Sequence, residues 1–231
     1  DHYNHVETQI DISSFVDYMV AEMFFANSDW PGNNQKLWRP QTADGKWRWI
    51  FMDLDAAYHP EAPNIFDFAM YEEGEMDWTR EPVSSFLFRN LLKNEQFTSR
   101  FIQRFGEILN KEFTPANGYR KLEQIKSLYA EELPRHINRW GYPSSVSSWH
   151  RDVEKNLMNF LKSRPCEVAR QVVRYFDLEK FGFSCTSGED FGALFSLAPN
   201  PSDGRFYIGN SSPKSLLFSI RIKDVSGRIV Y

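Results

Sequence analysis

The stretch AEMFFANSDWPGNNQKLWR, residues 21–39, decides the fold because it contains a helix end, a polar turn and a strand start. It begins inside the apolar run FVDYMVAEMFFA (15–26). It then places Asp29 before a Pro-Gly pair and Asn33 and Asn34 after it. Apolar residues recur at helical spacing before this turn, so the pattern predicts a helix over 12–26.

The composition is that of a folded globular protein. The chain has 231 residues, of which 42% are hydrophobic and 16% aromatic, enough to build one large domain or one domain with a small appendage. The formal net charge is −4, so we expect no nucleic-acid partner. No apolar run reaches the roughly 18 residues that span a bilayer, so we expect no transmembrane segment.

Amphipathic patterns flank the turn on both sides. Asp11 is a candidate cap for the helix over 12–26. Segment 59–81 shows no clear period and predicts a long, acidic surface loop. Beyond it the spacing predicts helices punctuated by prolines, over 82–94, 95–113, 117–140 and 147–176.

A second acidic stretch, KWRWIFMDLDAAY (46–58), follows the turn. The pattern predicts a β-hairpin with strands near 35–39 and 46–53. Alternate residues of a strand share a face, so Asp53 and Asp55 are expected to point the same way as Trp47, Trp49 and Phe51. Two carboxylates at the end of an apolar face are costly unless they meet a cation, and oxygen ligands favour Mg²⁺, Mn²⁺ or Ca²⁺.

Asp29 and Asn34 are five residues apart, as in a phosphotransferase catalytic loop. In such a loop the Asp accepts or orients the substrate hydroxyl and the Asn holds a metal ion. A second Asp, such as Asp53, then bridges the metal to the nucleotide phosphates. This order predicts that the two acidic stretches form one Mg-nucleotide site. The structural alternative makes Asp29 a turn or cap residue and Asn33 and Asn34 a left-handed turn.

The two stretches together resemble the spore-coat protein H (CotH) kinase family, a secreted atypical branch of the protein-kinase-like fold. The resemblance rests on the Asn-x-Asp-Trp-x-x-Asn-Asn and Asp-x-Asp motifs and covers roughly residues 5–180. It implies that Asp29 is catalytic, that Asn34 and Asp53 bind the metal and nucleotide, and that Asp55 shares the metal. The implied cofactors are ATP and Mg²⁺, or Mn²⁺.

The resemblance further implies a mainly α fold with a β-hairpin, the carboxyl-terminal lobe of a kinase-like protein. Its phosphate-binding upstream lobe would precede residue 1, so we expect weak or no activity from this chain alone. The implied reaction is phosphoryl transfer to a Ser/Thr hydroxyl of a secreted or surface protein. Two alternatives stay open: a non-catalytic surface scaffold or pseudokinase, and a Ca²⁺-stabilised domain in which Asp53 and Asp55 bind only the ion.

After Phe183 the sequence becomes rich in Ser, Gly and Pro. The tail LAPNPSDGRFYIGNSSPKSLLFSIRIKDVSGRIVY resembles the start of the β-sandwich sorting domain of type IX secretion in Bacteroidetes. That resemblance implies secretion and attachment to the outer cell surface through this module. We therefore expect a kinase-like lobe, a linker and a partial β-sandwich, at 1–183, 184–196 and 197–231.

The two cysteines, Cys166 and Cys185, match no metal-binding spacing. Two buried free thiols are the favoured expectation. A disulfide between them is the alternative.

Overall fold

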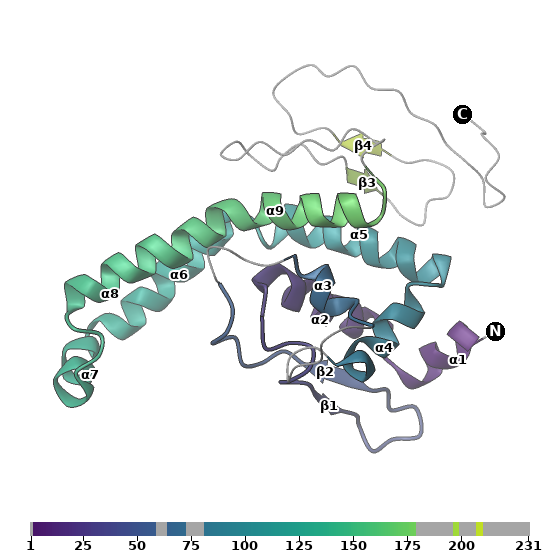
Figure 1. Ribbon diagram of the computed structural model, residues 1–231, viewed down its shortest axis with the longest axis horizontal. Helices are drawn as coiled ribbons and strands as arrows, with labels where there is room; N and C mark the ends of the chain where they lie inside the picture. Colours follow the sequence, from purple (N-terminus) through teal and green to yellow (C-terminus); the bar gives the residue numbers. More distant parts are fainter. Residues whose placement is uncertain (1, 59–63, 73–80, 179–195, 199–206, 210–231) are drawn as a thin grey trace. The chain divides into compact units, whose positions relative to one another are not determined.

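The chain divides into two compact units, Asp1–Phe191 and Gly192–Tyr231. A computed structural model describes residues 2–58, 64–72, 81–178, 196–198 and 207–209. The first unit is mostly helical with a two-stranded antiparallel sheet, as expected (Figure 1). In the second unit β3 (Ser196–Ala198) pairs antiparallel with β4 (Tyr207–Gly209). The predicted domain boundaries at 183 and 196 stay a prediction.

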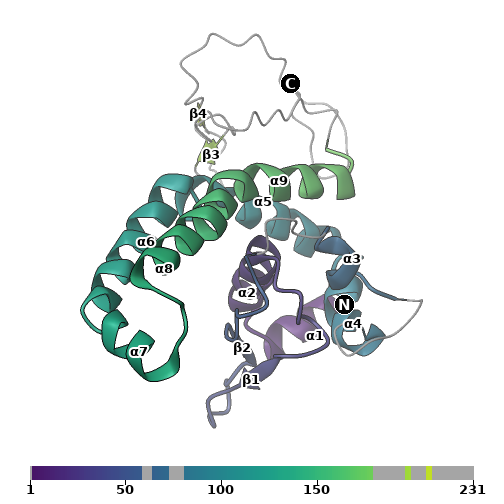
Figure 2. The same cartoon turned by 60° about the vertical axis from the view of Figure 1, so that its left-hand side comes forward.

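Helix α2 (Ile12–Phe25) is the central element of the first unit. Asp11 caps it as predicted, since its carboxylate accepts a hydrogen bond of 3.1 Å from Ser14 N. The helix contacts α5 (Glu95–Lys111), α9 (Asn159–Tyr175) and β2 (Arg48–Ile50), and Figure 2 shows it between the α5–α9 pair and the hairpin. The short helix α1 (His2–Gln9) precedes it.

Aromatic side chains from three helices form the centre of the core. Phe15 of α2 lies 6.5 Å from Phe88 of α4 (Pro82–Leu91) and 6.4 Å from Phe97 of α5, measured between ring centroids. Phe88 and Phe101 meet edge to face at 5.1 Å. Each ring is almost fully buried, which contributes about 1.5–3 kcal/mol per side chain. This cluster fixes the amino-terminal half of α2.

A buried arginine fixes the other end of α2. Arg164 of α9 is 0% exposed, and it donates through Nε to Phe24 O at 2.7 Å and through Nη2 to Met23 O at 2.6 Å. Burial lowers the pKa of Arg164 to about 10, so the group stays charged at neutral pH. A cation next to the last carbonyls of a helix is favourable because it complements the helix dipole.

The segment 117–140, predicted as one helix, forms two. α6 (Pro115–Ala130) ends before a short turn, and α7 (Leu133–Trp140) begins after it. The reason is Pro134, which fits the first turn of a helix but lacks the N–H that a helix interior requires. α6 packs along α9, and α7 connects α6 to α8 (Val146–Asp152).

The predicted helix over 147–176 contains Pro165, which does not end it. Helix α8 continues through the π-helical segment η1 (Val153–Met158) into α9, and Pro165 lies inside α9. Pro165 and both of its neighbours, Arg164 and Cys166, are buried. This packing offsets the backbone hydrogen bond that a proline cannot make.

Cys166 is buried and disulfide-bonded. The expectation of free thiols is therefore wrong for this residue. The other cysteine of the chain, Cys185, lies outside the described residues.

The hairpin strands are shorter than predicted. β1 (Lys36–Trp38) pairs with β2 so that Leu37 faces Trp49, and β2 ends at Ile50. The predicted shared face is therefore wrong: Asp53 lies beyond the strand with a φ of 60°, where the alternation of an extended chain no longer holds. The hairpin is also less buried than predicted, since Trp47 is 38% exposed and Phe51 40% exposed.

Part of the predicted surface loop 59–81 is a core element. Its described residues 64–72 include the short helix α3 (Phe66–Ala69). Phe66 is 2% exposed and stacks on Tyr175 at 4.3 Å between ring centroids. The loop prediction is wrong for this part because a single aromatic anchor gives no periodic signal. The other loop positions, 59–63 and 73–80, lie outside the described residues.

Candidate functional site

The loop after α2 is held by a buried tryptophan. Helix α2 ends at Ala26, which adopts a left-handed conformation (φ 52°) and bonds back to Glu22 O. Trp30 is 1% exposed and meets the Tyr18 ring edge to face at 6.4 Å. The Trp30–Pro31 peptide bond is cis. Trp30 therefore packs the loop as expected, while its neighbour Asp29 is half-buried at the surface.

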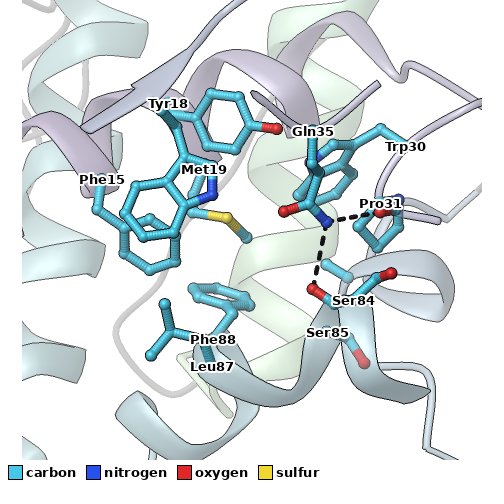
Figure 3. A pocket seen from close by; sticks show the side chains of 12 residues that line it. Phe15, Tyr18, Met19, Trp30, Pro31, Gln35, Ser84, Ser85, Leu87 and Phe88 are labelled. Carbon is cyan, nitrogen blue, oxygen red and sulfur yellow. Dashed lines mark hydrogen bonds between the residues drawn. The ribbon is translucent and has the colours of Figure 1, made fainter. Parts of the chain in front are cut away.

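Gln35 anchors the other end of this loop. Its Nε2 donates to Pro31 O at 2.5 Å and to Ser84 O of α4 at 3.3 Å (Figure 3). Tyr18 and Trp30 line a small cavity of about 20 Å³ beneath it. A space of this size admits no more than a water-sized group, so it is not a nucleotide site.

Hydrogen bonds bring the second acidic stretch against this loop. Ser28 donates to Ala56 O twice, from N at 3.1 Å and from Oγ at 3.0 Å. Tyr58 N donates to Phe25 O at 3.2 Å, and Asn27 Nδ2 donates to Asp53 O at 3.2 Å. Residues 25–28 therefore lie beside residues 53–58, although the β-hairpin separates the two segments in the chain.

This pairing gathers three carboxylates. The pKa of Asp29 is raised, first by burial and then by the negative charges of Asp55 and Asp53. Within the described residues, no hydrogen bond or ion pair engages the side chain of any of the three. The structure thus places Asp29, Asp53 and Asp55 near one another without a balancing cation from the described chain.

Asn34 lies in the same loop, five residues after Asp29, and is half-buried. Within the described residues, its side chain makes no hydrogen bond to the three aspartates. The backbone of Asn34 has a φ of 58°, so the predicted left-handed turn is real and falls on this residue. Asp53 shares this conformation (φ 60°). A positive φ is costly for a non-glycine residue, and the surrounding structure must offset that cost. Such residues are often found at functional sites.

The side chains present fit a nucleotide-bound Mg²⁺ better than a protein-only metal cage. In residues 2–58, 64–72 and 81–178, no three His, Cys, Asp or Glu side chains converge tightly enough to hold an ion. Mg²⁺ usually takes one or two carboxylates and completes its shell with water and phosphate oxygens, whereas Ca²⁺ needs about 6–8 oxygen ligands. Asn34, Asp53 and Asp55 supply oxygens of this kind.

Two buried residues of the site were missed from the sequence. Glu22 and Asn27 are both 0% exposed, and Asn27 Nδ2 donates to Glu22 Oε2 at 3.1 Å. Glu22 Oε1 and the Tyr18 hydroxyl are both buried, and neither makes a hydrogen bond of standard geometry within the described residues. Burial raises the pKa of Glu22 to about 7, against the opposing effect of Asn27 and Tyr18. The sequence offered two signals: Glu22 lies in the apolar end of α2, residues 18–25, and Asn27 is the first residue of the Asn-x-Asp-Trp motif.

Glu22 should make stability depend on pH. Its pKa is raised in the folded state, so its contribution to the free energy of unfolding is complete below pH 4.5 and is lost as the pH rises to about 7. The full loss is on the order of 3 kcal/mol. We expect Glu22→Gln to remove this pH dependence of stability, because a neutral amide cannot ionise.

The measurement is urea unfolding, followed by circular dichroism, at pH 5 and pH 8. The wild-type protein should lose more stability between the two pH values than the Glu22→Gln variant does. If the free energy of unfolding falls equally in both proteins between pH 5 and pH 8, the pKa of Glu22 is not raised.

The left-handed backbone of Asn34 predicts opposite effects of two substitutions. Asn34→Gly should leave stability nearly unchanged, because glycine adopts positive φ freely. Asn34→Ala should cost about 1 kcal/mol, because a Cβ disfavours this conformation. Asn33→Ala is the matched control, since the φ of Asn33 is not positive, and should change stability by less than about 0.5 kcal/mol. If Asn34→Gly is less stable than Asn34→Ala, the backbone of residue 34 is not left-handed.

No helix in the described part of the chain combines the length and hydrophobicity needed to cross a membrane. Comparison with curated proteins and with solved structures gave no significant match. Residues 1–181, which contain the loop, the hairpin and all of the helices described above, match the family described as "CotH kinase protein". The match covers most of the chain and suggests a kinase-like function. The chain belongs to the CotH kinase protein family.

Proposed function

We propose that residues 1–183 are the carboxyl-terminal lobe of an ATP- and Mg²⁺-dependent phosphotransferase. The observation that carries the proposal is the meeting of Asp29, Asp53 and Asp55, three carboxylates without a balancing cation in the described residues. Neighbouring carboxylates repel one another, and a cation bound among them relieves that repulsion. The side chains of Asp53 and Asp55 are exposed, so the cluster is open to such an ion. Membership of the kinase family supports ATP as the source of the phosphates that bring this cation.

In the proposed mechanism Asp29 acts as the base. The substrate hydroxyl oxygen attacks the γ-phosphorus of ATP in line, the bond from that phosphorus to the β,γ-bridging oxygen breaks, and ADP leaves. Asp29 takes the hydroxyl proton, and its raised pKa makes it a better proton acceptor than an ordinary aspartate. Asn34 and Asp53 would hold the Mg²⁺, with Asp55 as a further oxygen donor. When bound, the ion neutralises the charge on the transferred phosphoryl group.

The proposed substrate is a Ser/Thr hydroxyl of a secreted or surface protein. The disulfide at Cys166 supports a location outside the cytoplasm, because disulfides persist mainly in oxidising compartments. The antiparallel β3–β4 pair supports a β module in the tail, which we propose to be the start of a type IX sorting domain that attaches the protein to the cell surface.

The test is the binding of Mn²⁺, with and without ATP, measured by isothermal titration calorimetry on this chain. We expect Asp53→Asn to weaken Mn²⁺-ATP binding on the order of tenfold or more, because even outer-shell changes at metal sites have effects of this size. Asp29→Asn should leave this affinity nearly unchanged, and in a protein that also carries the expected upstream lobe it should abolish the formation of ADP in the presence of an acceptor hydroxyl. Asp44→Asn is the control, since it removes the same charge from the exposed hairpin turn.

Equal affinities of the Asp53→Asn and Asp44→Asn variants would overturn the metal assignment. Loss of Mn²⁺-ATP binding in Asp29→Asn would make Asp29 a structural residue. A wild-type protein that Ca²⁺ stabilises regardless of ATP would instead favour the Ca²⁺-stabilised domain.

A further inference from the structure

Asn27 is the only described side chain that bonds to both acidic segments and to α2. Asn27 is 0% exposed, and its side chain makes three hydrogen bonds. Its Nδ2 donates to Glu22 Oε2 at 3.1 Å and to Asp53 O at 3.2 Å, and its Oδ1 accepts from Asp29 N at 3.3 Å. Both amide protons and the amide oxygen of Asn27 are therefore in use.

Two of these partners are backbone groups of the proposed site residues. The bond to Asp29 N fixes the start of the catalytic loop, and the bond to Asp53 O fixes a residue with a left-handed backbone (φ 60°). Among the described side chains, Asn27 thus bonds to the backbone of both site residues. Ser28 also joins the two segments, but it bonds to Ala56, beyond both carboxylates.

Glu22 determines which way the Asn27 amide faces. Because Glu22 Oε2 accepts one N–H, the second N–H is directed to Asp53 O, and the amide oxygen is left for Asp29 N. A flipped amide would set its oxygen against Glu22 Oε2 and the carbonyl of Asp53. Oxygens that face each other in a buried site repel, so the flip is unfavourable.

We infer that Asn27, oriented by Glu22, is a positioning residue that holds the proposed metal ligand Asp53 beside the proposed base Asp29. The inference rests on the proposed function, since it assigns a role to that same site. Neither residue touches the metal or the substrate. Asn27 acts through the backbone of Asp29 and Asp53, and Glu22 acts through Asn27.

The decisive variant exchanges the carboxylate of Glu22 and the amide of Asn27. Glu22→Gln with Asn27→Asp keeps the total charge, and the amide of residue 22 can donate to the carboxylate of residue 27. The carboxylate can still accept from Asp29 N, but an ionised carboxylate has no proton to donate to Asp53 O. In the exchange variant, residue 27 therefore keeps its hydrogen bond to residue 22 of α2 and loses its hydrogen bond to Asp53 O.

The experiment measures Mn²⁺ affinity in the presence of ATP by calorimetry at pH 8, and stability by thermal unfolding, in the same set of proteins. We expect the exchange variant to regain most of the stability that Asn27→Asp alone loses. Its Mn²⁺ affinity should stay at least about tenfold below that of the wild type, the size of effect known for outer-shell residues. Ser28→Ala is the matched control and should bind Mn²⁺ within about twofold of the wild type, because its lost bond does not involve a site residue.

Wild-type affinity in the folded exchange variant would overturn the inference, and so would wild-type affinity in Asn27→Asp. Asp53→Asn in the same experiment separates this failure from that of the proposed function. If the wild type binds Mn²⁺ no better than Asp53→Asn, the metal site itself is absent and both proposals fail. If Asp53→Asn weakens binding and the Asn27 variants do not, only the positioning role is wrong.

Discussion

The hydrogen bonds from Arg164 to the last carbonyls of α2 are the constraint on which the rest of the site depends. The guanidinium comes from α9, 140 residues along the chain from Phe24, and fixes the point where α2 stops. The left-handed turn at Ala26 follows at once, and Asn27 then directs the chain toward Asp29. The position of the proposed catalytic residue is thus set by a buried charge on a distant helix. Without that charge, the carbonyls at the end of α2 would be buried and unpaired.

The same region concentrates features that reduce stability. Glu22 is buried with an unpaired oxygen, and Asn34 and Asp53 have left-handed backbones. None of these features helps the fold, and each has a cost of order 1–3 kcal/mol. Proteins retain such costs where function requires them, so their clustering at one place is independent support for a functional site.

Much of the fold could be predicted because it follows from local chemistry. The apolar spacing of residues 12–26, the Asp11 cap and the aromatic stripe of α5 are properties of short segments.

The candidate site residues were chosen from motif spacing: Asp29, Asn34, Asp53 and Asp55. The structure brings the three aspartates near one another, and their roles stay a prediction. The expected β-face of Asp53 and Asp55 was wrong because the chain turns left-handed at Asp53, which strand periodicity cannot reveal. Asn27 belongs to the Asn-x-Asp-Trp motif, but its hydrogen-bond partners could not be predicted because Asp53 becomes its neighbour only in the folded protein.

The central claim is that one divalent cation bridges the two acidic segments together with a nucleotide. Anomalous scattering from crystals of this chain grown with Mn²⁺ and ATP tests it most directly, because manganese is then located without reference to any variant. The account predicts a single strong peak between the Asp53 carboxylate and the side-chain oxygen of Asn34, with the γ-phosphate on the Asp29 side. A peak bound only by other residues, or a nucleotide bound away from Asp29 and Asp53, would contradict it.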